Sequence, residues 1–163
     1  MSPTTTASSP RLAITRRHLG AVARHAAAAY PEECCGFLLG RFGAGEDGVL
    51  VERVLPARNE HAQSPRSRFL IAPETVLAAR REARGLGLDV VGYYHSHPDH
   101  AAEPSAHDLE DAWPNVSYLI VPVAEGLPGA PRSWRLRDGG GFEEEVVEAL
   151  GDTSGPGGRR RRR

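Results

Sequence analysis

The chain has 163 residues, of which 40% are apolar and 25% charged, a composition that suits one globular domain and leaves too little length for two. No stretch approaches the roughly 20 apolar residues that span a bilayer, and residues 1–10 lack the apolar segment of a secretory signal. We therefore expect a cytoplasmic protein with no membrane partner.

The net charge is -1, but residues 159–163 are five arginines. The net charge of the rest of the chain is therefore more negative than -1. An acidic body argues against a nucleic-acid-binding face. We expect one folded domain over residues 11–150, between disordered ends at 1–10 and 151–163. Cys34 and Cys35 are adjacent, which disfavours a disulfide and agrees with a reducing compartment.

The first half of the domain shows helical and strand patterns in turn. Apolar residues at helical spacing predict a helix that Thr15 caps and that runs to Tyr30, where Pro31 stops it. Four elements then follow in the order of the chain: a buried strand over residues 35–42, a half-exposed strand over 49–55, a polar loop over 59–67 and a short strand over 68–71.

The second half begins with an amphipathic helix that Pro73 opens and that ends near residues 85–87. A β-prone run over residues 89–94 then leads into His95-Ser-His97-Pro98. We expect a short helix over 105–113, strands over 116–123 and 133–137, and either a strand or a short helix over 142–150, with Trp113 and Trp134 as core candidates. Interleaved helices and strands predict an α/β domain with a mixed sheet flanked by helices.

His95 and His97 are the first candidates for chemistry. Residues two apart in a strand point to the same face, and Pro98 places this pair at the end of its strand. Two imidazoles on one face begin a zinc site but are a weak signal alone.

Asp108 is the candidate third ligand, beyond a loop that can fold back across the strand end. Three protein ligands leave a tetrahedral position open for water, which is typical of a catalytic zinc. The segment Ser105-Ala-His-Asp108 also fits a helix capping box that needs no metal. Beside the histidine pair we favour the ligand interpretation.

A water activated by zinc also needs a carboxylate base that lies near the metal without binding it. Glu32 and Glu33 directly precede the buried strand that begins at Cys35. The residue pattern alone does not choose between these two glutamates.

Two segments, Pro31–Gly40 and His95–Asp108, resemble the JAMM (MPN-plus) metallopeptidases. The family pattern is a distant glutamate, then HxH, seven residues, serine, two residues and aspartate. Residues 31–40 also fit the P-x-E-x-C-G-x-L-x-G opening of the small bacterial and archaeal members, which selects Glu33 over Glu32. The likeness covers roughly residues 11–123 and includes Asn59–Pro73, which resembles the loop before the family's second helix.

The resemblance implies a fold and a set of roles. The fold is an α/β domain of the cytidine-deaminase-like kind, with a curved mixed sheet between helices. Zn²⁺ would be held by His95, His97 and Asp108, with Glu33 as general acid/base and Ser105 as a hydrogen-bond donor to the oxyanion. Asn59 is a weaker candidate for substrate binding.

The resemblance also implies a partner. Family members cleave peptide or isopeptide bonds after the C-terminal Gly-Gly of ubiquitin-like proteins, and the small forms resemble peptidases of sulfur-carrier proteins, one of which releases cysteine from a carrier–cysteine adduct. We expect this class of reaction here. The alternative is a non-catalytic MPN scaffold that binds a ubiquitin-like partner, and such scaffolds have typically lost one or more ligands. The sequence does not indicate the oligomeric state.

Overall fold

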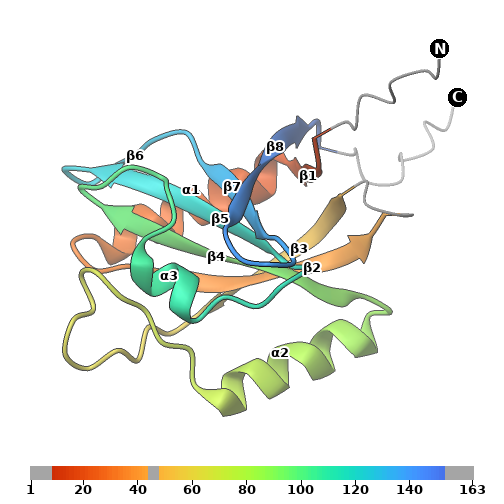
Figure 1. Cartoon of the computed structure of the whole chain (residues 1–163), viewed down its shortest axis with the longest axis horizontal. Coiled ribbons are helices and arrows are strands. Elements are labelled where there is room, and N and C mark those ends of the chain that lie inside the picture. The colour runs from red at the N-terminus through yellow and green to blue at the C-terminus, as the bar shows by residue number, and fades with distance from the viewer. Residues whose placement is uncertain (1–8, 44–47, 153–163) are drawn as a thin grey trace, which may run out of the picture.

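Eight strands and three helices make up the part of the chain that the computed structural model describes, residues 9–43 and 48–152 (Figure 1). In chain order the elements are β1 (Arg11–Thr15), α1 (Arg16–Ala29), β2 (Cys35–Phe42), β3 (Val49–Ala57), α2 (Pro73–Gly85), β4 (Asp89–Pro98), α3 (Ala106–Glu110), β5 (Ser117–Ala124), β6 (Leu127–Pro128), β7 (Arg132–Leu136) and β8 (Phe142–Leu150). Apart from residues 9–10 and 151–152, the two ends that we predict to be disordered lie outside the described residues.

The strands form one mixed sheet in the order β4-β2-β3-β1-β8-β7-β5-β6. Strand β4 pairs with β5 as well as with β2, so the sheet closes on itself and only β6 lies outside the ring. The α/β class and the mixed sheet are confirmed. The expectation of a curved sheet lying between helices is corrected to a closed, barrel-like sheet, and the cytidine-deaminase-like label stays a prediction.

The sequence patterns located most elements, and the exceptions have physical reasons. Strand β1 was not predicted, because its five residues run directly into the helix that Thr15 caps through its hydroxyl. The open choice over residues 142–150 resolves to a strand, β8, which pairs in parallel with β1. Residues 68–71 form no strand, since side-chain and loop hydrogen bonds hold the backbone there instead.

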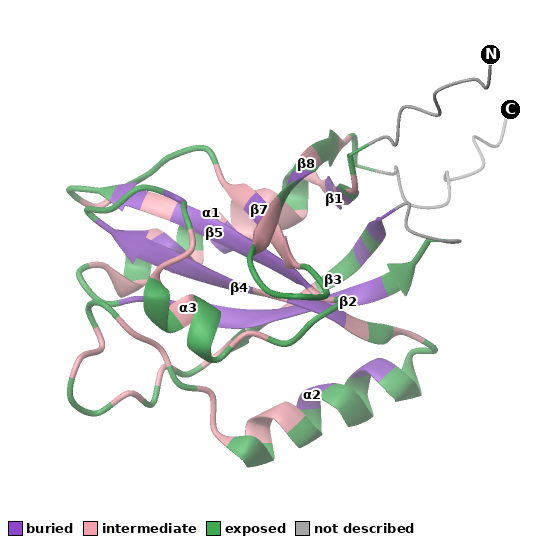
Figure 2. Ribbon diagram, in the orientation of Figure 1, coloured by how far each residue is buried: buried purple, intermediate pink, exposed green. Residues whose placement is uncertain are grey.

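Two helices cover different faces of the sheet. Val22 and Ala26 of α1 lie in one core cluster with Leu38 and Tyr94, while α2 packs on Phe37 and the strand residues beside it. Adjacent residues of β2 therefore face different helices, as the two-residue period of a strand requires. Figure 2 shows buried residues concentrated on the strands and exposed residues along the outer side of α2.

The two tryptophans do not fill the core as expected. Trp113 is 64% exposed, so that prediction is wrong, and Trp134 is only half-buried. Both cysteines are buried and unpaired, which confirms the absence of a disulfide in the described residues. Among these residues no helix combines the length and the apolar character that crossing a bilayer requires. The cytoplasmic location stays a prediction.

We predict that Gly40→Ala destabilises the fold, because a Cβ at this position would lie 1.9 Å from the backbone oxygen of Leu50. The paired strands must separate to admit it, which costs about 1–3 kcal/mol or more. Gly85→Ala is the matched control, since a Cβ added there, at the end of α2, would have no atom within 4 Å and alanine favours the helix. Urea unfolding measures both, and equal midpoints for the two variants would contradict the prediction.

Candidate metal centre

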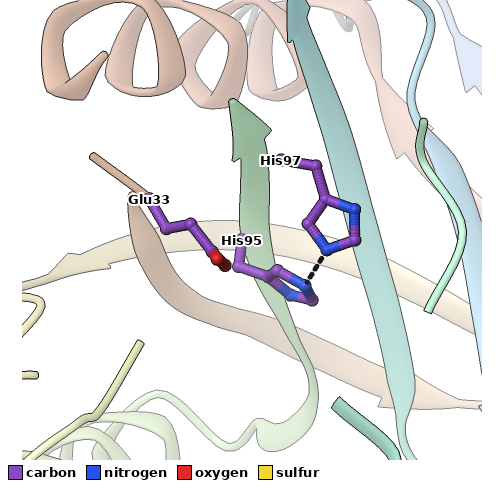
Figure 3. Close-up of side chains that lie close together, drawn as sticks. All are labelled: Glu33, His95 and His97. Carbon is purple, nitrogen blue, oxygen red and sulfur yellow. Dashed lines mark hydrogen bonds between the residues drawn. The ribbon is translucent and has the colours of Figure 1, made fainter. Parts of the chain in front are cut away.

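The end of β4 carries the two histidines side by side. His95 is fully buried and His97 is 7% exposed, and the two rings lie 4.9 Å apart between centroids. Their Nε2 atoms are 3.1 Å apart (Figure 3). The two-residue spacing in an extended strand thus brings both imidazoles to one point.

Asp108 reaches the same point from the first turn of α3. Its Oδ1 lies 3.2 Å from Nε2 of His95, and its Oδ2 lies 3.1 Å from Nε2 of His97. The capping box also forms, because the Ser105 N–H donates to Oδ2 of Asp108 at 2.8 Å and the Asp108 N–H donates to Oγ of Ser105 at 3.1 Å. The two interpretations of this segment are therefore compatible, since the cap orients the carboxylate toward the histidines.

The donor set fits a divalent metal ion. Zinc ligands at bond lengths of about 2.0–2.1 Å stand about 3.3 Å apart around a tetrahedral ion, close to the contacts found here. Nδ1 of His97 lies 2.7 Å from the carbonyl oxygen of Ala101. Because a carbonyl only accepts, Nδ1 carries a proton, and Nε2, which lies 3.1 Å from the Asp108 carboxylate, is the nitrogen that would face a metal ion after releasing any proton of its own.

In the metal-free protein the two histidines differ in their protonation. Burial would lower the pKa of His97, but its hydrogen bonds with Asp108 and with the Ala101 carbonyl outweigh this effect and raise the pKa, so a metal ion would have to displace that proton. Burial lowers the pKa of His95, which favours the neutral ring. Burial alone would raise the pKa of Asp108, but its hydrogen bonds with His95 and His97 outweigh this effect and hold the pKa well below its usual range. Metal binding requires a neutral imidazole and an ionised carboxylate. The ring of Phe69 stacks on His95, with centroids 4.7 Å apart, and limits its rotation.

Glu33 is the fourth polar group at this point. Ligand atoms of Glu33, His95 and His97 all lie within 4.8 Å of one another, so Glu33 is itself a possible metal ligand. The contacts of Asp108 with both histidines, at 3.1 and 3.2 Å, are closer to the spacing of bound ligands. This comparison favours Asp108 in the coordination shell. Figure 3 shows the carboxyl of Glu33 close to His95.

The main chain holds Glu33 in place on both sides. Its N–H donates to the carbonyl of Pro65 at 2.8 Å, and its own carbonyl accepts from the side-chain amide of Asn59 at 3.0 Å. The residue is 4% exposed, and its Oε1 has no hydrogen-bond partner. Burial raises the pKa of Glu33 to about 8. The charge of nearby His97 lowers this pKa, and the charge of Asp108 raises it. A buried carboxyl of this kind is suited to proton transfer near neutral pH.

Asn59 and Ser105 differ in how far their side chains are already engaged. The amide of Asn59 lies within hydrogen-bond distance of five backbone groups: the carbonyls of Glu33, Pro65 and Arg68 and the N–H groups of His61 and Leu70. It organises the loop that holds Glu33, and the predicted substrate contact stays a prediction. Oγ of Ser105 accepts one hydrogen bond, which leaves its O–H free to donate.

A cavity of about 980 Å³ opens beside the metal centre. His95 and Asp108 line it, together with charged side chains such as Arg68, Arg80 and Glu110. Large apolar side chains of α2, of the loop before it and of the segment after α3 line it as well: Phe69, Leu70, Ile71, Val76, Leu77 and Trp113. Tyr93 lines this cavity, whereas Tyr94 packs in the core beneath α1.

Trp134 supports the site and was not identified as a functional residue from the sequence. Its Nε1 donates to the carbonyl of Ala102 at 2.9 Å, one residue after the carbonyl that binds His97. Arg132 stacks on the indole at 4.7 Å and pairs with Glu103 at 3.2 Å. No sequence pattern marks this contact, because its acceptor is a main-chain carbonyl.

We predict that Trp134→Phe weakens metal binding about tenfold, in the range found when an outer-shell partner of a ligand is removed. The buried Ala102 carbonyl would lose its donor, and the neighbouring peptide that orients His97 would loosen. Competition with a chromophoric chelator measures the zinc affinity. Trp113→Phe, at an exposed position, is the control, and equal affinities for the two variants would show that the indole N–H does not matter.

We also predict a pH effect on the metal-free protein. Folded Glu33 keeps its proton up to about pH 8, whereas an unfolded glutamate releases it near 4.5. The free energy of unfolding therefore falls as pH rises through this window, by up to about 1.4 kcal/mol per pH unit from this group. Urea unfolding in excess chelator should show a flatter profile for Glu33→Gln, and parallel profiles would contradict the assigned pKa.

Comparisons with known proteins agree with this geometry. The family described as prokaryotic homologs of the JAB domain matches residues 15–137. The chain is 38% identical over 91 residues to a desampylase of Haloferax volcanii, a match that covers 55% of this chain and 62% of that protein. It is 32% identical over 129 residues to the CysO-cysteine peptidase of Mycobacterium tuberculosis, a match that covers 78% of this chain and 84% of the relative.

The chain is 40% identical over 70 residues to a probable TtuB-protein conjugate cleaving protease of Thermus thermophilus. This match covers 43% of this chain and 47% of that protein. The solution structure of protein DSY2949 from Desulfitobacterium hafniense superposes with a TM-score of 0.73 and 33% identity, covering 86% of this chain and 94% of the other. The resemblance to small prokaryotic JAMM proteins is thereby confirmed, and the chain belongs to the family of prokaryotic homologues of the JAB domain.

Proposed function

We propose that this protein is a zinc metallopeptidase that hydrolyses the bond after the C-terminal Gly-Gly of a ubiquitin-like or sulfur-carrier protein. The observation that carries the proposal is the convergence of His95, His97 and Asp108, with contacts of 3.1–3.2 Å, beside the buried Glu33, whose Oε1 has no hydrogen-bond partner. A structural metal site is closed by four protein ligands, whereas three leave a position for substrate or water.

Each of these residues has a chemical task in the proposed reaction. Zn²⁺, when bound by the two histidines and Asp108, supplies a Lewis acid that polarises the scissile carbonyl and makes water more acidic. Glu33 accepts a proton from the attacking water and delivers it to the leaving amine. Ser105 donates its free O–H to the oxyanion that develops at the carbonyl, an interaction worth about 3 kcal/mol.

The cavity at the metal centre suits an extended tail. Glycine has no side chain, so a Gly-Gly end can approach the buried histidines, while the residues before it contact the apolar wall that includes Leu70 and Trp113. Two of the relatives named above act, by their names, on CysO-cysteine and on a TtuB-protein conjugate. These names support a carrier-protein substrate for this chain, and cysteine is one leaving group that the proposal includes.

We predict that Glu33→Gln retains the metal but loses at least 100-fold in turnover, because glutamine keeps the shape of the side chain and cannot carry the proton. A carrier protein whose Gly-Gly end is extended by one residue is incubated with the zinc-loaded enzyme and followed by mass spectrometry. Glu52→Gln, exposed on β3, is the charge-matched control. Undiminished cleavage by the Glu33 variant would refute its role.

The alternative is a scaffold that binds a ubiquitin-like partner without cleaving it. All five positions of the family pattern are filled here, which favours the enzyme. Metal content separates the two, since a scaffold has no need of an ion. A protein that binds carriers but neither takes up stoichiometric zinc nor cleaves them would support the scaffold.

A further inference from the structure

His61 lies in the loop after β3, where that loop borders the metal centre. The residue lines the cavity of about 980 Å³ together with His95 and Asp108. It also lines a second cavity, of about 750 Å³, to which Glu33 contributes. His61 is therefore part of the surroundings of the metal centre, although the sequence pattern of the site does not include it.

The hydrogen bonds of His61 determine which of its ring nitrogens carries the proton. The main-chain N–H of Ser64 donates to Nδ1 of His61 at 3.0 Å. A nitrogen that accepts from an N–H group carries no proton itself, so the neutral ring holds its proton on Nε2. Within the described part of the chain, Nε2 has no hydrogen-bond partner. His61 thus presents an N–H donor that the folded chain does not use.

The side chain of Asn59 connects the main chain of His61 with that of Glu33. Its Oδ1 accepts from the His61 N–H at 3.0 Å, and its Nδ2 donates to the Glu33 carbonyl at 3.0 Å. The position of the imidazole is therefore linked to that of the proposed general acid/base. A donor that is held in place before the substrate arrives binds at a lower entropic cost.

Several other donors on the wall of the larger cavity already have partners. Arg68 and the ring of His107 both contact the carboxylate of Glu110, at 3.7 and 3.8 Å. Arg80 forms a side-chain hydrogen bond with Tyr93. The free Nε2–H of His61 differs from these groups because it is a neutral donor, which suits an uncharged acceptor.

We propose that His61 is a substrate-binding residue whose Nε2–H donates to a main-chain carbonyl of the carrier's Gly-Gly end. The inference rests on the proposed peptidase function and adds a residue that holds the tail in position. Glycine has no side chain, so only its amide groups can be recognised, and a carbonyl oxygen accepts from a neutral N–H. The metal and Ser105 take the carbonyl at which water adds, which leaves the carbonyl before it for His61.

Two substitutions separate this role from a purely structural one. His61→Asn places an amide oxygen near the position of Nδ1, so it keeps an acceptor for the Ser64 N–H and loses the donor at Nε2. His61→Gln reaches further and places an amide N–H near the position of Nε2, so it keeps the donor and loses the acceptor. A residue that only closes the loop would tolerate asparagine better than glutamine, whereas a substrate-binding donor requires the reverse.

The measurement is the cleavage of a carrier ending in Gly-Gly-Ala by the full-length, zinc-loaded proteins, followed by mass spectrometry. His61→Asn should lose at least about tenfold in kcat/KM through a higher KM, with kcat and the zinc affinity unchanged, because the donor acts on the substrate and not on the metal. His61→Gln should stay within about threefold of the wild type, as a neutral donor remains in place.

Three results would overturn the inference while leaving the peptidase function intact. The first is wild-type kinetics in His61→Asn. The second is a loss in His61→Gln that equals or exceeds the loss in His61→Asn. The third is a loss confined to kcat, which would show that the substitution displaces Glu33 and not the substrate.

A binding measurement covers the case in which the wild type cleaves no carrier and the proposed function itself fails. Calorimetric titration of the zinc-loaded proteins with a carrier ending in Gly-Gly detects the tail without turnover. The wild type and His61→Gln should both bind this carrier at least about tenfold more tightly than His61→Asn. Any other order of affinities, or no binding by the wild type, would contradict the inference.

Discussion

The antiparallel ladder between β2 and β4 is the constraint on which the site depends. Its register pairs Cys35 with His95, so the residue two positions before Cys35 comes to lie beside the two histidines. Glu33 and His95 are far apart in sequence, and no local interaction would bring them together. Burial of the side chains fixes this register, because a one-residue slip would turn every side chain to the other face.

Two carbonyl contacts and one helix cap complete the geometry that the ladder begins. The cap between Ser105 and Asp108 orients the carboxylate, and the Ala101 carbonyl selects the tautomer of His97. The loop organised by Asn59 then fixes the main chain of Glu33 from the opposite side. Backbone groups thus hold His97, Asp108 and the main chain of Glu33, whereas the ring of Phe69 packs on His95. The functional atoms stay available for metal, water and substrate.

Local patterns in the sequence anticipated much of this arrangement, for identifiable reasons. The two-residue period of a strand predicts that His95 and His97 share a face, and the short spacing to Asp108 allows one loop to return across the strand end. Choosing Glu33 over Glu32 needed the family resemblance, since only the register of β2 with β4 distinguishes them.

What the patterns missed depends on contacts distant in sequence. Closure of the sheet requires β1 to pair with both β3 and β8, and its few residues carry no signal of two partners. Trp134 supports the site through a hydrogen bond to a main-chain carbonyl in another segment. The apolar indole ring of Trp134 predicts a core position instead. The segment over residues 68–71 has strand-like composition, but the side chain of Asn59 takes the place of a neighbouring strand.

The coordination shell itself tests the central claim most directly. X-ray absorption at the zinc edge of the zinc-loaded protein should show only nitrogen and oxygen neighbours at about 2.0–2.1 Å, with the multiple-scattering signature of two imidazoles. A sulfur neighbour at about 2.3 Å, which only Cys34, Cys35 or Met1 could supply, or a shell with more than two imidazoles, would contradict the arrangement of His95, His97 and Asp108 described above.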